Sequence, residues 1–180
     1  MTTLRLGSVY VDPPHPATLE DEVLLKACRF HRGHSPGPGG QHRNRVQTLV
    51  EIHHVPTGLK AHAGERRSAE QNKRKAVFRL RLVLAVWIRS PVSVGEIRSE
   101  LWKSRVKDGR IACNEAHRDY PAMLAEALDV IVDAGLDAHK ASVRLRCSQS
   151  QLIKLLAKHP PALAALNSAR EAKKLHPFRA

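Results

Sequence analysis

Apolar residues recur at helical spacing in one long segment near the middle of the chain. Five apolar side chains between Ser68 and Arg89 share one face of a helix: Ala76, Val77, Leu80, Leu84 and Trp87. Basic residues decorate much of the remainder, and Pro91 follows, which cannot continue a helix because it has no amide N–H. The pattern predicts a long amphipathic helix from about residue 68 to residue 89.

Two alternating segments precede that helix and predict a β-hairpin. They are LVEIHH (Leu49–His54) and GLKAHAG (Gly58–Gly64), and the residues between them are typical of a turn at Pro56–Gly58. Further upstream, LEDEVLLKAC (Leu19–Cys28) predicts a short amphipathic helix with acids in its first turn, where the helix dipole favours them. Residues 1–16 contain DPPHP and are expected to form an extended arm.

The segment after the long helix carries one capping pattern and one turn. SVGE (Ser93–Glu96) is typical of a capping box and predicts a short helix that ends near Lys103. KDGR (Lys107–Arg110) predicts a turn.

Helix start and stop signals dominate the C-terminal third. Asp119, with Pro121 close behind it, predicts the start of a helix that Gly135 ends. A second capping box, SQSQ at residues 148–151, opens another helix, and two prolines separate that helix from a last one over residues 162–174.

Together these elements predict an α+β fold. We expect a small β-sheet that carries a glycine-rich loop, a long helix packed across the sheet, and an all-α C-terminal module. The expected division is an extended arm, a sheet domain with the loop and the long helix, a connecting helix and turn, and a helical module: residues 1–18, 19–90, 91–116 and 117–180.

The charge of the chain favours a polyanionic partner, and nucleic acid is the first candidate. The formal net charge is +13 at pH 7. Twelve Lys/Arg and three acids lie between Phe30 and Val94, so much of the excess surrounds the glycine-rich loop. A solvated surface is the other interpretation of such charge.

Cysteine usage and hydropathy argue against several classes of protein. The three cysteines lie far apart without a C-x-x-C, so neither a disulfide framework nor a thiolate zinc site is expected, which fits a reducing cytosol. No segment approaches the roughly 18 apolar residues that a membrane helix needs. The N-terminus also lacks an apolar run of signal-peptide length. We expect a cytoplasmic monomer that contacts no membrane.

The loop SPGPGGQHRNRVQT (Ser35–Thr48) has features of a backbone catalytic site. Glycine adopts positive φ without penalty and allows the backbone to approach a ligand closely. Gly39 and Gly40 can turn the backbone N–H of Gln41 outward, where it would act as an oxyanion donor. The loop fits neither the nucleotide P-loop nor the dinucleotide fingerprint. A plain surface turn is the alternative on these residues alone.

An ordered series of motifs follows the loop. GPGGQHRNRVQT leads into VEIHHVPTGLKAHAGERRSAEQNKRKAVFRLRLVLA. Over residues 22–85 this series resembles the GGQ catalytic domain of class I peptide-chain release factors, and it is most similar to the codon-independent ribosome-rescue factors. A lone GGQ is a weak signal, but four further motifs occur in the family's order: Pro56-Thr57-Gly58, Arg67-Ser68, Gln71-Asn72-Lys73 and Ala76.

The resemblance implies a peptidyl-tRNA hydrolase, a carboxylic ester hydrolase that acts with the ribosome. Gly39 and Gly40 would set the backbone shape. The Gln41 N–H would stabilise the tetrahedral intermediate and the departing 3′ oxygen, and the Gln41 side chain would help to select water. Positioning is then the main contribution of the protein, and no cofactor or metal is expected. RNA-binding roles are expected for His42, Arg43, Arg45, Arg66, Arg67, Lys73, Arg74 and Arg81.

The implied partners are the ribosome, through its 23S-type rRNA, and peptidyl-tRNA. Only 38 residues precede Gly39, which is too few for a codon-reading domain, so release without stop-codon specificity is expected. The resemblance leaves open whether a delivery protein brings the factor to the ribosome. It also leaves open whether a glutamine methyltransferase modifies Gln41.

The chain departs from the family pattern at several positions. Arg45 stands where the family usually has lysine, and Pro38 replaces the common alanine. Bacterial rescue factors of this kind end in a disordered basic tail, whereas residues 146–180 carry regular apolar positions and are expected to fold. How a stalled ribosome would be recognised therefore stays open.

Two other functions stay open beside the catalytic one. The first is a non-catalytic RNA- or ribosome-binding protein that retains the loop. The second is a DNA-binding regulator, because KASVRLRCSQSQLIKLL (Lys140–Leu156) resembles a helix-turn-helix, with Arg146 in place of the frequent turn glycine. Peptide release from a ribosome without a stop codon would separate the catalytic function from both.

The eleven histidines raise the question of a metal site. Several crowd around the loop and the hairpin, and His53 and His62 could face each other across two strands. No H-E-x-x-H and no ligand quartet at zinc spacing occurs. Polar histidines on an RNA-facing surface are the preferred interpretation.

Overall fold

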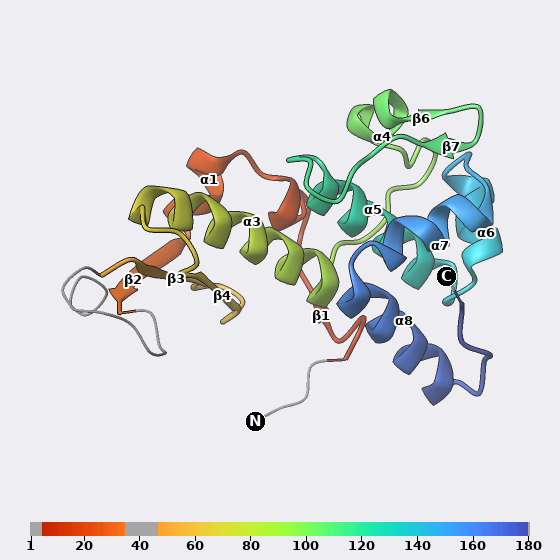
Figure 1. The fold of residues 1–180 in the computed structure, drawn as a ribbon. Coiled ribbons are helices and arrows are strands. Elements are labelled where there is room, and N and C mark those ends of the chain that lie inside the picture. The colour runs from red at the N-terminus through yellow and green to blue at the C-terminus, as the bar shows by residue number, and fades with distance from the viewer. Residues whose placement is uncertain (1–4, 35–46, 180) are drawn as a thin grey trace. The chain divides into compact units, whose positions relative to one another are not determined.

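The computed structural model describes residues 5–34 and 47–179, which form two compact units (Figure 1). Residues 19–84 make up one unit, which we call the sheet unit. Residues 1–18 and 85–180 make up the other, which we call the helical unit. Helices combine with a small sheet, so the predicted α+β class is confirmed.

Over residues 19–34 and 47–84, the sheet unit contains a three-stranded antiparallel sheet and two helices. The strand order is β2–β3–β4, with strands Cys28–Gly33, Leu49–His54 and Lys60–Ala63. The helices are α1 (Asp21–Lys26) and α3 (Ala69–Trp87), and the last three residues of α3 belong to the helical unit. The predicted β-hairpin is confirmed, and Gly58 supplies the positive φ of its turn, at 72°.

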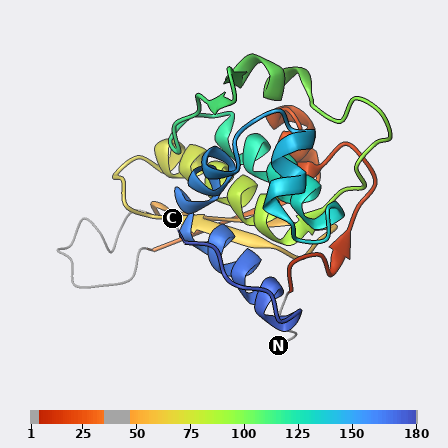
Figure 2. The same ribbon diagram turned by 90° about the vertical axis from the view of Figure 1, so that its right-hand side faces the viewer.

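Helix α3 lies across one face of the sheet (Figures 1 and 2). On β3 and β4, buried residues alternate with more exposed ones, and the buried apolar set is Val50, Ile52, Ala61 and Ala63. The buried positions of α3 within this unit recur at helical spacing, as the sequence predicts, and include Ala76, Val77, Leu80 and Leu84. These two faces form the core of the sheet unit.

Strand β2 corrects the predicted boundary of the first helix. That helix was expected to run to Cys28 and to be followed directly by the loop, but α1 ends at Lys26. Residues Cys28–Gly33 instead form an antiparallel edge strand along β3. Without β2, the outward backbone groups of β3 would have no strand partner, which explains why this segment is extended.

The helical unit joins the end of α3 to the N-terminal segment. Helix α3 was expected to reach residue 89, but it ends at Trp87 because Ile88–Arg89 form strand β5, which runs parallel to β1 (Val9–Tyr10). The 3-10 helix η1 (Pro16–Thr18) contacts helix α5 of the same unit. Residues 5–18 therefore pack as part of the helical unit, rather than extending as a free arm.

In the described residues of the helical unit, the remaining elements are a short helix, a two-stranded hairpin and four longer helices. They are α4 (Glu100–Arg105), β6 (Val106–Lys107), β7 (Arg110–Ile111), α5 (Tyr120–Asp133), α6 (Ala138–Arg144), α7 (Gln149–Ala157) and α8 (Pro160–Ala172). The helical character predicted for the C-terminal third is confirmed. Helix α8 begins at the two prolines rather than after them, since proline is well suited to the first turn of a helix.

Two predicted caps behave differently from expectation. The capping box at Ser93 does not form, and Ser99 caps α4 instead by accepting a hydrogen bond from the Trp102 amide at 3.0 Å. The backbone amide of Ser99 in turn donates a hydrogen bond to the carboxylate of Glu126 on α5, at 2.9 Å, and this holds Ser99 in place. Asp119 precedes α5, but its carboxylate accepts from Arg105 at 2.6 Å instead of capping the helix.

His15 links the N-terminal segment to strand β5. Its Nε2 lies 2.9 Å from the carbonyl oxygen of Ile88, and its Nδ1 accepts from the Ala17 amide at 3.0 Å. Both contacts are satisfied by the neutral ring with its proton on Nε2. Burial lowers the pKa of His15 to about 4, and the nearby Arg89 charge acts in the same direction.

We expect the helical unit to lose stability as the pH falls from about 6.5 to about 4. The unfolded chain takes up the His15 proton near its ordinary pKa of 6.5, whereas the folded state resists it down to about 4. The stabilisation is therefore fully present above pH 6.5, and on the order of 3 kcal/mol is lost over this interval. The measurement is urea unfolding followed by tryptophan fluorescence, because Trp87 and Trp102 both lie in the helical unit.

The matched control is His15→Gln, which cannot titrate. The difference in unfolding free energy between the two proteins should shrink as the pH falls. A difference that stays constant from pH 7 to pH 4 would contradict a buried neutral histidine.

Candidate functional site

The predicted catalytic loop is bounded by two paired strands. The residues themselves, Gly39, Gly40 and Gln41, and the expected RNA contacts His42, Arg43 and Arg45, lie outside the described residues. Strand β2 ends at Gly33 and β3 begins at Leu49, and these two residues are register partners. The loop therefore leaves and re-enters the sheet at neighbouring strand ends (Figure 1).

Asn72 anchors the chain directly after the loop. It lies in the first part of α3 and is fully buried. Its Nδ2 donates to the carbonyl oxygens of Thr48, at 2.7 Å, and Arg66, at 2.8 Å, and its Oδ1 accepts from the Arg66 amide at 2.9 Å. One side chain thus ties the start of α3 to the residue before β3 and to the turn after β4.

Sequence reasoning did not assign Asn72 to the site. It noted the residue only as part of the QNK motif. We expect Asn72→Ala to destabilise the sheet unit by about 2–3 kcal/mol, because it leaves three backbone groups without their partner. Asn72 acts as a positioning residue, so the order of the strand end that follows the loop should fall as well.

The neighbouring Gln71 is exposed and supplies a matched control in Gln71→Ala. Thermal unfolding followed by circular dichroism measures the stability of each variant. Hydrogen exchange over residues 47–54 reports the order of the segment that follows the loop. Equal protection of this segment in both variants would contradict the anchoring role.

Four of the expected RNA-binding residues gather near this anchor. Arg66 and Arg67 are exposed in the turn before α3, and Lys73 and Arg74 lie in the first turns of the helix. Arg74 has only a weak exposed contact with Glu70, with 3.6 Å between Nε and Oε1. Because Asn72 links the Arg66 backbone to Thr48, this cluster lies beside the point where the loop re-enters the sheet.

Arg81 differs from these four cations. Its Nη2 lies 2.6 Å from the Asp21 carboxylate, and its side chain is only 12% exposed. The ion pair links α3 to α1 inside the sheet unit. Arg81 is therefore engaged in holding these two helices together, in addition to any role toward RNA.

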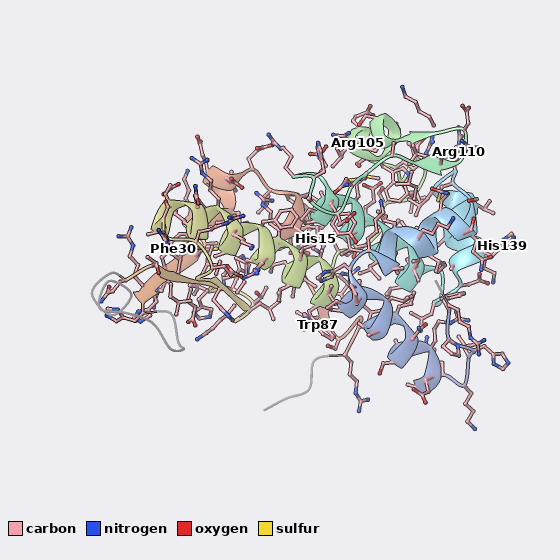
Figure 3. All side chains as sticks on the ribbon, in the orientation of Figure 1. His15, Phe30, Trp87, Arg105, Arg110 and His139 are labelled. Carbon is pink, nitrogen blue, oxygen red and sulfur yellow. The ribbon has the colours of Figure 1, made fainter. Side chains whose placement is uncertain are left out.

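Strand β2 adds residues that sequence reasoning did not assign to the site. Phe30 is 40% exposed, and the Lys73 ammonium lies 5.2 Å from the centre of its ring, within the range of a cation–π interaction (Figure 3). Arg29 and Arg32 are also exposed on this strand. The alternation of Cys28 and Phe30 with polar residues was the available signal for a strand here.

The histidines of the hairpin do not form the arrangement considered from the sequence. His53 lies opposite Lys60, whereas His62 lies opposite Glu51, so the expected facing of the two histidines was wrong. His54 is buried and lies 2.8 Å from the Thr57 hydroxyl, where it supports the Pro-Thr-Gly turn. Burial lowers the pKa of His54, and the nearby His53 acts in the same direction.

Neither a metal cluster nor a membrane helix occurs in the described part of the chain. Over residues 5–34 and 47–179, no three His, Cys, Asp or Glu side chains gather in a way that could hold a metal ion. None of the helices in these ranges is both long enough and apolar enough to span a membrane.

Comparison with known proteins points to one family. Residues 20–121 match the RF-1 domain family, which covers more than half of the chain. The match includes the whole sheet unit except Leu19, together with α4 and the β6–β7 hairpin. It ends at the start of α5, before most of the C-terminal helices.

Several curated proteins are similar to this chain. Peptide chain release factor 1 of Streptococcus thermophilus is 31% identical over 139 residues, which cover 67% of this chain and 38% of the relative. The corresponding factor of Dictyoglomus turgidum is 32% identical over 145 residues, which cover 71% and 39%. Peptide chain release factor 2 of Helicobacter acinonychis is 26% identical over 137 residues, which cover 73% and 38%. The chain thus spans less than two fifths of the length of these relatives.

Proposed function

This chain belongs to the class I peptide-chain release factor family, and from that premise we propose that it hydrolyses the ester between a nascent peptide and tRNA on the ribosome, without reading a stop codon. The observation that carries the proposal is the GGQ sequence at residues 39–41, inside the region that matches the RF-1 domain. The register of β2 and β3 and the bonds of Asn72 support it, because they anchor both flanks of the loop.

The proposed chemistry uses the backbone of the loop. Water adds to the ester carbonyl carbon, and the Gln41 N–H donates a hydrogen bond to the oxygen on which negative charge develops. The intermediate then collapses, and the tRNA 3′ oxygen leaves and takes up a proton. Gly39 and Gly40 permit the backbone shape that this donor needs. The Gln41 side chain helps to admit water rather than a larger nucleophile.

The cations near the loop anchor are proposed to hold ribosomal RNA. In this proposal, Arg66, Arg67, Lys73 and Arg74 would contact phosphates when the loop enters the peptidyl-transferase centre. We propose His42, Arg43 and Arg45 as further contacts from within the loop. We propose Arg81 as a further RNA contact, and its ion pair with Asp21 also holds α3 to α1.

The second part of the proposal is that hydrolysis does not depend on a stop codon. The resemblance of the loop and its following motifs to ribosome-rescue factors supports it. We propose that the factor acts as a cytosolic monomer with 23S-type rRNA and peptidyl-tRNA as its partners. A delivery protein and a glutamine methyltransferase that modifies Gln41 are further partners that the release assay leaves open.

A release assay tests this proposal. Ribosomes carrying labelled peptidyl-tRNA in the P site would be prepared with the A site empty, with a stop codon, or with a sense codon. We expect hydrolysis on the empty A site that does not depend on a stop codon. Release only with a stop codon would contradict codon independence, and binding without any release would favour a non-catalytic RNA-binding protein.

A further inference from the structure

The helical unit carries a set of cations that have no acidic partner. From residue 138 to residue 170 the chain contains six Lys/Arg and no Asp or Glu. Arg144 pairs with Asp133, at 2.6 Å, on the preceding helix. Several other exposed cations in and near this stretch make no ion pair with any residue that the structure describes, and four of them are Lys107, Arg110, Arg146 and Lys154.

Backbone contacts bring the elements that carry these four cations together. Lys107 and Arg110 are register partners in the β6–β7 hairpin, so their side chains leave the hairpin on the same side. The Ser148 amide donates a hydrogen bond to the carbonyl oxygen of Gly109 at the tip of the hairpin, at 3.0 Å. Ser148 caps α7 and therefore joins the hairpin to the first turn of that helix.

The other two cations of the set lie in the turn between α6 and α7 and on the exposed side of α7. Arg146 is exposed in this turn with a positive φ of 51°. It lines an open hollow of about 330 Å³ together with Gly95, Glu96, Ile97 and Arg144, and the Glu96 carboxylate there is paired with Arg98. Lys154 lies one helical turn after the exposed Ser150, on the outer side of α7. Figure 3 labels Arg110 on the hairpin, which meets α7 at the N-terminal end of that helix.

The burial of α7 restricts how this surface can meet nucleic acid. A helix that reads DNA bases places its side chains deep in the major groove. Four of the nine residues of α7 are buried in the unit: Leu152, Ile153, Leu155 and Leu156. Only Gln149, Ser150 and Lys154 are well exposed on it. The surface therefore has spaced cations that can bind phosphates, but few exposed side chains that could contact the edges of bases.

We propose that Lys107, Arg110, Arg146 and Lys154 form a second RNA-binding surface, which holds the backbone of an A-form RNA helix. A-form RNA has a major groove too narrow for side chains, so proteins recognise such helices mainly through shape, phosphates and 2′-hydroxyls. Separate exposed cations without acidic partners fit that mode of contact. Asp108 at the hairpin tip is the one acid within the two strands and their turn, and it limits how closely a phosphate approaches there.

Binding of a model RNA to the full chain tests the proposal. The probe is a labelled RNA duplex of about 16 base pairs, measured by fluorescence anisotropy from low to high salt. A DNA duplex of the same sequence is measured in parallel. The combined variant Lys107→Gln, Arg110→Gln, Arg146→Gln and Lys154→Gln should bind the RNA at least about tenfold more weakly. Its salt dependence should fall by about one unit of slope for each lost phosphate contact.

A matched control removes the same charge elsewhere in the helical unit. The combined variant Lys103→Gln, Arg118→Gln, Lys173→Gln and Lys174→Gln should retain most of the RNA affinity. Unchanged tryptophan fluorescence verifies folding of both variants, and the single exposed change Lys154→Glu gives a second test that carries little folding risk.

Two results would overturn the proposal. Equal weakening by both combined variants would show that net charge alone attracts the RNA. Tighter binding of the DNA duplex would favour the DNA-binding regulator instead. The assay needs no ribosome and no hydrolysis, so its outcome is independent of whether Gln41 catalyses release.

Discussion

Replacing Gln41 by proline is expected to abolish measurable peptide release, whereas Gln41→Ala should retain part of it. Proline removes the backbone N–H that is proposed to stabilise the oxyanion, but alanine keeps this donor and loses only the side chain. The loss of one such donor typically lowers the rate by about 10²–10³. Single-turnover release from ribosomes with an empty A site, at saturating factor, measures the chemical step separately from binding.

Controls separate this chemical effect from folding and from binding. Thermal stability should be unchanged in both variants, because Gln41 is polar and neither change removes apolar surface from a core. Ribosome affinity should also be similar to that of the wild type. Equal and full release by both variants would contradict backbone catalysis by Gln41.

Breaking the buried ion pair between Arg89 and Asp129 is expected to give the largest loss of stability in the helical unit. The Arg89 side chain is fully buried, and its Nη1 lies 2.9 Å from the Asp129 carboxylate. The Asp129 Oδ1 also accepts from the Ser90 amide at 3.2 Å. Burial lowers the pKa of Arg89 to about 10 and raises that of Asp129 to about 7, while each charge opposes the shift of the other.

Both pKa shifts have burial as their largest cause, so burying the two charges costs free energy. The stability of each variant therefore depends on whether a buried charge is left without its partner. Asp129→Ala leaves a buried guanidinium without its partner and should cost about 3–5 kcal/mol. The double variant Arg89→Met/Asp129→Leu removes both charges, so much of this loss should be recovered. Urea unfolding followed by the fluorescence of Trp87 and Trp102 measures both variants within the helical unit.

The exposed pair Arg144–Asp133 provides a matched control. Its atoms are 2.6 Å apart, but the two side chains are 35% and 47% exposed. Asp133→Ala should therefore cost less than about 1 kcal/mol. An Asp129→Ala variant as stable as this control would show that Asp129 does not compensate the buried charge of Arg89.

The sequence could predict elements whose interactions are local. The long helix, the hairpin with its Pro-Thr-Gly turn and the cap at Ser148 depend on residues within a few positions of one another. Strand β2 was missed for the opposite reason. Four of its six residues are exposed, so its pattern of burial is weak, and its conformation depends on pairing with β3 across the loop.

The choice between two candidate caps illustrates the same limit. Ser93 and Ser99 are both suitable capping residues before a short helix. Only the tertiary structure brings Glu126 to Ser99, 27 positions away in the sequence, while Glu96 is held by Arg98 instead. The predicted cap at Ser93 was therefore wrong, because a long-range hydrogen bond favours the later serine.

The sequence by itself determined the family resemblance, the basic character and the α+β class of this protein. Motif order and local periodicity are properties of the chain, so they can be recognised without coordinates. Only the tertiary structure decided what each cation does: Arg81 pairs with Asp21, Arg89 is buried against Asp129, and Lys107 and Arg146 stay exposed. The physical reason is that ion pairs and burial join residues tens of positions apart, and no local pattern in the sequence records those distances.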